Sequence, residues 1–283
     1  MPESLLDRLK DLVPGPWRTR PPVVPVVRLA GAIGLTTPLR SGLSLATAGP
    51  LLERAFALRG AAAVAISLNS PGGAAVQSHL IHLRIRALAE QKKLPVYVFI
   101  EDAGASGGYM IACAGDEIVA DPGSIVGSIG VVSAGFGFDR VLERVGIDRR
   151  VYTAGTRKLI LDPFQPERED EVERLKALQR DVHESFIELV KARRGARLAG
   201  DDAVLFSGEF WSGRRALELG LVDALGDVRS YLRERFGEKV RLKPITAPRG
   251  LLARRFGLVP ASSLAEELVA TLEARALWAR YGL

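Results

Sequence analysis

Continuous apolar runs that alternate with helical patterns are the feature that most constrains how this chain can fold. Residues 61–69 (AAAVAISLN) and 94–101 (LPVYVFIE) are apolar almost throughout, and a helical segment follows each of them. A strand that is apolar on both faces belongs in a sheet covered by helices on both sides. The chain is therefore predicted to be an α/β protein. Further strands are expected at 23–29, 118–120, 149–155 and 239–245, and helices at 46–58, 76–91, 167–194, 212–220 and 227–236.

No linker divides the 283 residues convincingly, so we expect one main domain with helical arms. The expected parts are an N-terminal helical arm at 1–22, the main domain at 23–245 and a C-terminal helical arm at 246–283. Leucines at helical spacing within residues 4–13 favour a short helix that docks on protein, and a membrane-surface helix is the alternative. A last helix is expected from Ser263, where Glu266 completes a capping box.

The net charge of +6 does not indicate nucleic-acid binding, because basic and acidic residues interleave along the whole chain. A weak attraction to an anionic membrane surface fits the charge equally well. The single cysteine excludes an intramolecular disulfide framework and a cysteine-based metal site, and no cofactor or metal is expected. No signal peptide or spanning helix is evident, so we expect a cytoplasmic protein, with peripheral contact at the inner membrane left open.

The stretch EDAGASGGY, residues 101–109, places one serine among three glycines, between a predicted strand and a predicted helix. The glycines could form a plain turn, or they could let a substrate backbone approach a nucleophilic Ser106. Residues 104–108 also match the G-x-S-x-G pattern of α/β-hydrolases, which requires a histidine further along the chain. The one downstream histidine, His183, falls inside the predicted long helix, so we discount the hydrolase interpretation.

A nucleophilic serine without a histidine needs another base, and a lysine can serve if it loses its proton. Burial and neighbouring hydroxyl groups favour the neutral amine. Lys158, in YTAGTRKLILDPF, is the best candidate because the apolar triplet that follows it is expected to draw it inward. Taken alone, a lysine in such a loop is usually a surface residue. The adjacent glycines of LNSPGG, residues 68–73, could aim N–H groups at an oxyanion or form a plain turn.

Four segments in this order closely resemble the S49 peptidases, the signal peptide peptidase A family. They are LNSPGG, EDAGASGGYMIACAGDEIVADPGSIVGSIGV, YTAGTRKLILDPF and FSGEFWSGRRALELGLVDALGD, and the resemblance covers roughly residues 60–235. It implies a ClpP/crotonase-like fold, a spiral of β-β-α units. It also implies that the chain forms a homo-oligomeric ring that acts on peptides, with each site supplied by one subunit or by two neighbours.

The same resemblance implies a role for each matching residue. Ser106 takes the nucleophile position, Lys158 the general-base position, and the hydroxyl of Ser128 orients the lysine. Gly73 and Gly107 take the positions of the oxyanion-hole N–H donors. The substrate is expected to run along Gly72, Ile129 and Val131.

These roles predict a serine endopeptidase with a Ser–Lys dyad that cleaves short or unfolded apolar peptides, including signal-peptide remnants. One alternative is an inactive ring that binds peptides or scaffolds a membrane complex, and the presence of both Ser106 and Lys158 argues against it. Another alternative is a crotonase-like acyl-CoA enzyme, which uses carboxylates near its oxyanion hole and needs neither residue.

Overall fold

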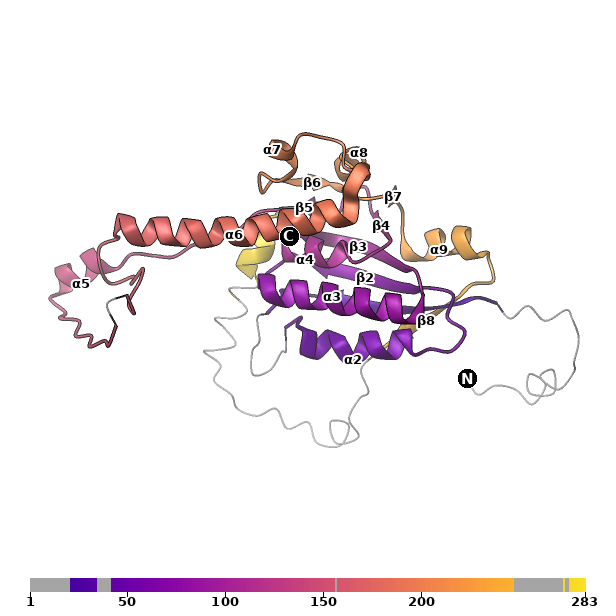
Figure 1. Ribbon diagram of the computed structural model, residues 1–283, viewed down its shortest axis with the longest axis horizontal. Helices are drawn as coiled ribbons and strands as arrows, with labels where there is room; N and C mark the ends of the chain where they lie inside the picture. The colour runs from indigo at the N-terminus through magenta and orange to yellow at the C-terminus, as the bar shows by residue number, and fades with distance from the viewer. Residues whose placement is uncertain (1–20, 35–41, 156, 247–271, 273–274) are drawn as a thin grey trace, which may run out of the picture.

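The computed structural model describes residues 21–34, 42–155, 157–246, 272 and 275–283. The helix predicted at 4–13 lies outside these residues, and so does the start of the helix predicted from Ser263, of which residues 272 and 275–279 are described and helical. Within them, the chain forms one eight-stranded sheet with helices on both faces, so the predicted α/β architecture is confirmed (Figure 1). No helix among the described residues is long and apolar enough to cross a membrane.

The sheet runs in the order β6-β5-β3-β2-β1-β8, and β4 pairs with both β3 and β7. All pairs are parallel except β5 with β6. Strand β3 is long enough to pair first with β4, through Tyr97–Ile100, and then with β5, through Ala103–Ala105. The strands are β1 (Val23–Ala30), β2 (Val64–Ser70), β3 (Val96–Ala105), β4 (Glu117–Ala120), β5 (Ile125–Gly127), β6 (Phe210–Ser212), β7 (Ala224–Leu225) and β8 (Arg241–Ile245).

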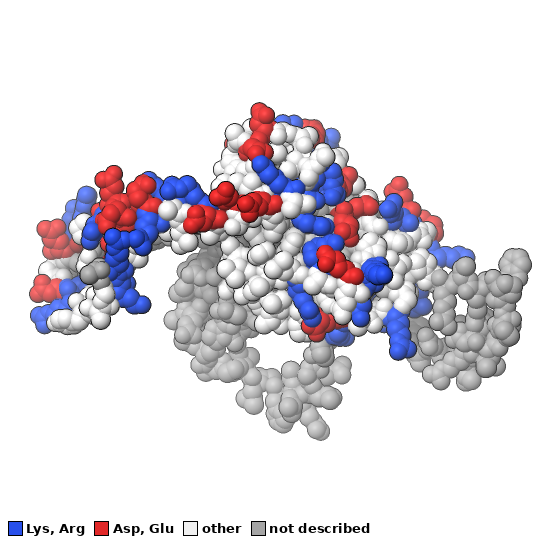
Figure 2. Space-filling model, viewed as in Figure 1, with Lys and Arg blue, Asp and Glu red and all other residues white. Residues whose placement is uncertain are grey.

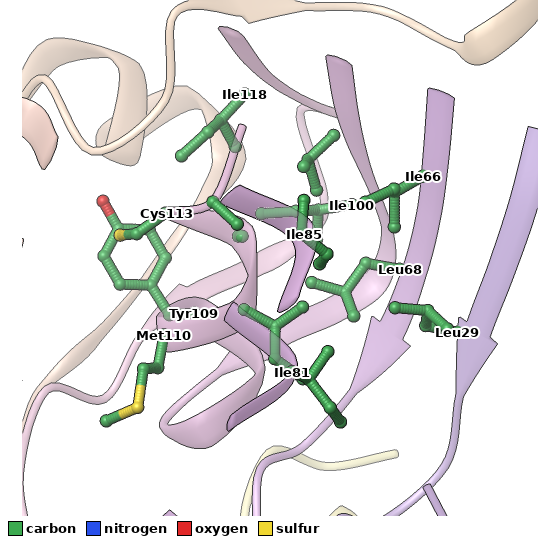
Figure 3. Close-up of a cluster of buried hydrophobic side chains, with 14 of the residues drawn as sticks. Leu29, Ile66, Leu68, Ile81, Ile85, Ile100, Tyr109, Met110, Cys113 and Ile118 are labelled. Atoms are coloured by element: carbon green, nitrogen blue, oxygen red, sulfur yellow. The ribbon is translucent and has the colours of Figure 1, made fainter. Parts of the chain in front are cut away.

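The central strands are apolar on both faces because both faces are covered. Ile66 and Leu68 of β2 pack toward helix α3 (Ala75–Lys92), within the cluster drawn in Figure 3. Ala65 points to the opposite face, where it shares a second cluster with Leu232 of α9 (Val228–Phe236). This alternation is the two-residue period of a strand buried on both sides. The other helices are α2 (Leu45–Phe56), α4 (Gly107–Ala112), α5 (Asp139–Val145), α6 (Glu169–Arg194), α7 (Asp202–Leu205), α8 (Gly213–Glu218) and the 3-10 turn Gly195–Arg197.

The C-terminal end of α6 is anchored by a buried ion pair. The Arg194 guanidinium, with 1% of its side chain exposed, lies 2.7 Å from a carboxylate oxygen of Asp223 and donates to the carbonyl of Gly220. The Tyr109 hydroxyl of α4 donates to the neighbouring carbonyl of Leu221. These contacts fix α4, α6 and the turn before β7 to one another.

Residues 131–155 and 157–168, with the first half of α6, form an arm that projects from the sheet, with α5 near its tip (Figure 1). On the face shown in Figure 2, side chains of both charge signs mix along this arm. The strand predicted at 149–155 is wrong, because these residues are exposed on the arm, where no strand pairs with them. Several large apolar side chains of the arm are exposed, among them Phe136, Val141, Val145, Ile147 and Tyr152.

Candidate active site

Ser106 lies at the sharp turn between β3 and α4, and its side chain is half-buried. Its backbone has φ 54° and ψ −123°, a conformation that residues other than glycine rarely adopt. The turn is held on both sides, because the Ser106 N–H donates to the Gly127 carbonyl over 2.8 Å and its carbonyl accepts from the N–H of Met110. The surrounding structure therefore fixes the serine at the end of the central strand.

Two glycines let the loop after β2 pack directly against this turn. A Cβ atom on Gly72 would lie 2.7 Å from the Ser106 Cβ, and one on Gly73 would lie 2.2 Å from the Ile33 carbonyl oxygen. Both glycines also have positive φ angles, 103° and 140°. The two glycines of LNSPGG are therefore required by backbone packing, whatever their chemical role.

The N–H groups of Gly73 and Gly107 have no hydrogen-bond acceptor among the described residues. Gly107 opens α4, so its N–H lacks an intrahelical partner. Both glycines line the same cavity as Ser106. An oxyanion formed at the serine is the kind of group that such unpaired N–H donors stabilise.

Ser128 follows β5 and also has a positive φ angle, 53°. Its N–H donates to the Glu209 carbonyl over 2.6 Å, and its side chain lines the Ser106 cavity. Of the residues expected along the substrate path, Gly72 packs against Ser106 and Val131 lines the cavity. The Ile129 side chain is fully buried and does not line it.

The cavity beside Ser106 has a volume of about 510 Å³. One wall is apolar and comes from Met110 of α4 with Val182 and Phe186 of α6. The serines and the glycine backbone also line the cavity. The cavity therefore combines a hydroxyl, unpaired N–H donors and an apolar surface, which suits an extended peptide with apolar side chains.

Lys158 does not belong to this cavity. It is an exposed residue in a turn of the projecting arm, and its N–H donates to the Gly155 carbonyl. The expectation that the following apolar triplet draws it inward is wrong for the described conformation. The triplet stays with the arm, where the Leu161 N–H donates to Glu171 of α6. One chain in this conformation therefore does not bring Ser106 and Lys158 together.

His183 and Tyr281 are among the residues at the cavity that were not predicted as site residues. His183 lines the cavity, and its Nε2 lies 2.9 Å from the Ile129 carbonyl oxygen. The sequence offered a signal, because His183, Phe186 and Val190 recur on one face of α6 at helical spacing. Tyr281 is buried and its hydroxyl lies 3.2 Å from the Ser128 hydroxyl. Nothing in its local sequence indicates this contact.

The other two histidines have no contact with the cavity. His79 is exposed on α3. His82 is buried, with its Nδ1 2.9 Å from the Met110 carbonyl oxygen, and burial lowers its pKa to about 4. His82 is therefore a neutral packing residue beneath α4.

Comparison with known proteins identifies the family that this chain matches. The peptidase family S49 model matches residues 88–241 of the 283, which is more than half of the chain. Mutant structures of the 1510-N membrane-bound stomatin-specific protease, one of them in complex with a substrate peptide, align with TM-scores of 0.48 at 16% identity. The first covers 81% of this chain and 100% of that chain, and the second covers 89% and 98%.

Three relatives show the range of similarity. A Brucella abortus (strain 2308) protein named Na(+)/H(+) antiporter NhaA is 55% identical over 97% of this chain, which spans 39% of that relative. The Arabidopsis thaliana protein named serine protease SPPA, chloroplastic, is 31% identical over 72% of this chain and 30% of its own length. A Synechocystis protein named as a candidate protease, slr0021, is 36% identical over 69% of this chain and 72% of its own length. By the family match and this last similarity, the chain belongs to peptidase family S49.

Proposed function

We propose that the chain is a serine endopeptidase in which Ser106 is the nucleophile and Lys158 the general base. The observation that carries this proposal is the placement of Ser106 in a strained turn, in one cavity with Ser128 and the N–H donors of Gly73 and Gly107. Strained backbone that the surrounding structure maintains is typical of reactive positions. Membership of the S49 family supports the same reading.

The proposed reaction needs a neutral Lys158 amine. The amine accepts the Ser106 hydroxyl proton while the serine oxygen bonds to the peptide carbonyl carbon. The N–H groups of Gly73 and Gly107 hold the resulting oxyanion. The tetrahedral intermediate then collapses, the C–N bond breaks, and the leaving amine takes the proton from Lys158. Water, deprotonated in turn by Lys158, hydrolyses the acyl-enzyme and restores Ser106.

We infer that Lys158 acts on the Ser106 of a neighbouring subunit. The arm that carries Lys158 projects from its own sheet and exposes apolar side chains such as Phe136, 80% exposed, and Tyr152, 91% exposed. Exposed apolar clusters of this kind favour association. In a closed homo-oligomeric ring, each arm contacts the next subunit. Every exposed arm is then covered, and every Ser106 receives a Lys158 from its neighbour.

Short or unfolded apolar peptides are the proposed substrates, signal-peptide remnants among them. An extended chain can lie in the open cavity, and the wall formed by Met110, Val182 and Phe186 accepts apolar side chains. We propose a cytoplasmic location, with contact at the membrane surface as a route to such peptides.

A covalent serine probe separates this proposal from its alternatives. A fluorophosphonate should form an adduct at Ser106, found by mass spectrometry of the digested protein, and the adduct should be lost in Lys158→Ala. Ser207, which lines the same cavity, provides the control, because Ser207→Ala should leave the Ser106 adduct unchanged. An acyl-CoA enzyme or an inactive ring predicts no adduct at Ser106, and that outcome would reject the proposal.

A further inference from the structure

The last described segment of the chain, residues 275–283, lies against the Ser106 cavity. Leu277 and Arg280 line this cavity together with Ser106 and Ser128. In Figure 1 the yellow segment lies beside α6. Only 8% of Tyr281 is exposed, whereas Leu283 after it is 52% exposed. Tyr281 is therefore the one buried residue of the segment, with Leu277 and Trp278 half-buried.

The Tyr281 phenol contacts two segments that line the cavity. Its hydroxyl lies 3.2 Å from the Ser128 hydroxyl and 3.4 Å from the Pro71 carbonyl oxygen. Its ring meets the Phe210 ring edge-on, with 5.0 Å between the ring centres. Pro71 precedes the glycines of the proposed oxyanion hole. The phenol thus spans the gap between the oxyanion loop and the segment that begins at Ser128.

We propose that residues 275–283 are an intrachain occupant of the substrate cleft that keeps the enzyme closed. This inference rests on the proposed function, because Tyr281 holds the Ser128 hydroxyl that would orient the incoming Lys158 amine. A serine hydroxyl has two acceptor lone pairs, so a bond from Tyr281 does not by itself prevent a second bond. The exclusion comes from space, because the phenol hydroxyl lies between Ser128 and Pro71, and Leu277 and Arg280 of the same segment line the cavity.

Two arrangements of the chain follow. In the closed arrangement, Tyr281 bridges Ser128 and Pro71, and Lys158 remains exposed on the arm. In the open arrangement, residues 275–283 have moved away from the Ser106 cavity, a peptide lies in it, and Lys158 can approach Ser128. Because the segment belongs to the same chain, its high effective concentration weakens the apparent affinity for every external peptide. An apolar peptide with an aromatic side chain is the competitor that best matches the Tyr281 position beside Phe210.

The test measures peptide binding in a protein that cannot cleave. A fluorescein-labelled extended decapeptide of alanine, leucine and one tyrosine is titrated with the full Ser106→Ala chain, and binding is followed by fluorescence anisotropy. Adding Tyr281→Phe removes the phenol hydroxyl and keeps the ring, and should tighten binding about threefold to tenfold. Adding Tyr281→Ala also removes the contact with Phe210 and should tighten binding more. The matched control is Leu283→Ala, an exposed position of the same segment, which should leave the affinity unchanged.

Hydrolysis by the same variants with Ser106 intact separates this inference from the proposed function. Tighter binding together with faster hydrolysis supports both. Tighter binding without hydrolysis by any variant supports the inference that the segment closes the cleft, and it rejects the proposed peptidase activity. If the Tyr281→Phe variant binds the peptide equally, more weakly or not at all, and its unfolding midpoint is unaltered, the inference that the segment closes the cleft is overturned. If hydrolysis also falls in that variant, Tyr281 is a positioning residue for Ser128 instead.

Discussion

The N–H of Ser106 donates to the carbonyl of Gly127 over 2.8 Å, at the point where β3 pairs with β5. Ser128 follows Gly127 directly, so this bond ties the proposed nucleophile to the hydroxyl proposed to orient the base. Both serines have positive φ angles, and the same sheet pairing holds them in place. The serine side of the site is therefore built within one subunit, and only the lysine remains to be brought in.

Ser106→Ala and Lys158→Ala should each lower kcat/KM for peptide hydrolysis by about a thousandfold or more, because either change removes a reacting group. If neighbouring subunits share the site, mixing the two inactive variants should restore activity. A random ring of equal parts should reach about a quarter of the wild-type rate, because a quarter of its sites combine an intact serine with an intact lysine.

Lys176→Ala is the matched control for the lysine change, since Lys176, which lies on α6, is exposed as Lys158 is and pairs only with Glu173 among the described residues. It should keep the wild-type rate. Mixed variants that remain inactive, although native mass spectrometry shows mixed rings, would place both groups of the dyad in one chain.

Replacing His183 should affect substrate binding more than chemistry. Its ring bonds the Ile129 carbonyl and so supports the segment from Ser128 to Val131, along the proposed substrate path. His183→Leu removes the donor and should raise KM about fivefold to tenfold, a loss typical of one hydrogen bond. His183→Gln keeps an N–H donor on a side chain of similar reach and should recover most of the affinity. Equal KM values in wild type and His183→Leu would show that this bond does not shape the substrate path.

Arg194→Met should destabilise the fold without touching the cavity. Burial alone would raise the pKa of Asp223, yet the hydrogen bonds from Arg194 keep that pKa below its usual value. Removing the guanidinium leaves a half-buried carboxylate whose one remaining cationic partner among the described residues is Arg197, 45% exposed, beside the N–H donor of Ile118. The free energy of unfolding should fall by about 3 kcal/mol, measured by urea denaturation.

The comparison is Arg233→Met, whose exposed pair with Glu238 should be worth less than about 1 kcal/mol. Similar losses of unfolding free energy in the two variants would mean that the buried ion pair stabilises the fold no more than the exposed pair does.

The fold should lose stability as the pH falls, partly through His82. Burial lowers the pKa of His82 to about 4, and the positive charges of Arg193 and Arg86 act in the same direction. In the unfolded chain the imidazole binds its proton below about pH 6.5, so between these two values the unfolded state holds the extra proton. Acidification from about pH 6.5 to about pH 4 should therefore cost up to about 3 kcal/mol through this residue.

His82→Asn, which removes the titrating ring and keeps a short N–H donor, isolates this contribution. The unfolding free energy of the variant should vary less with pH than that of the wild type over the same range. Parallel curves for the two proteins would assign the acid sensitivity to other groups.

Much of the sheet followed from the sequence because its signals are local. The apolar run at 61–69 became β2, the run at 94–101 became the first part of β3, and the amphipathic pattern at 167–194 became α6. The continuation of β3 to Ala105 was missed, since the glycine there reads as a turn, whereas pairing with β5 keeps it extended. Residues 149–155 have strand composition but no strand partner, and composition cannot supply one.

The site was predictable where chemistry depends on short motifs. The glycines of LNSPGG and the turn at Ser106 mark close backbone packing, and the structure places both at one cavity. The separation of Lys158 from the Ser106 cavity was not predictable, because it depends on where the arm projects and not on neighbouring residues. The contact of Tyr281 with Ser128 joins residues 153 positions apart, and no local pattern reports such a distance.

The most direct test of the central claim is hydrolysis of unstructured apolar peptides by the wild type, Ser106→Ala and Lys158→Ala, read by mass spectrometry. The three proteins are compared between about pH 6 and about pH 10, since a neutral amine is required and becomes more abundant as the pH rises. The Ser–Lys mechanism predicts fragments from the wild type alone, formed faster at alkaline pH. Fragments from all three proteins at equal rates, or from none of them although rings assemble, would contradict it.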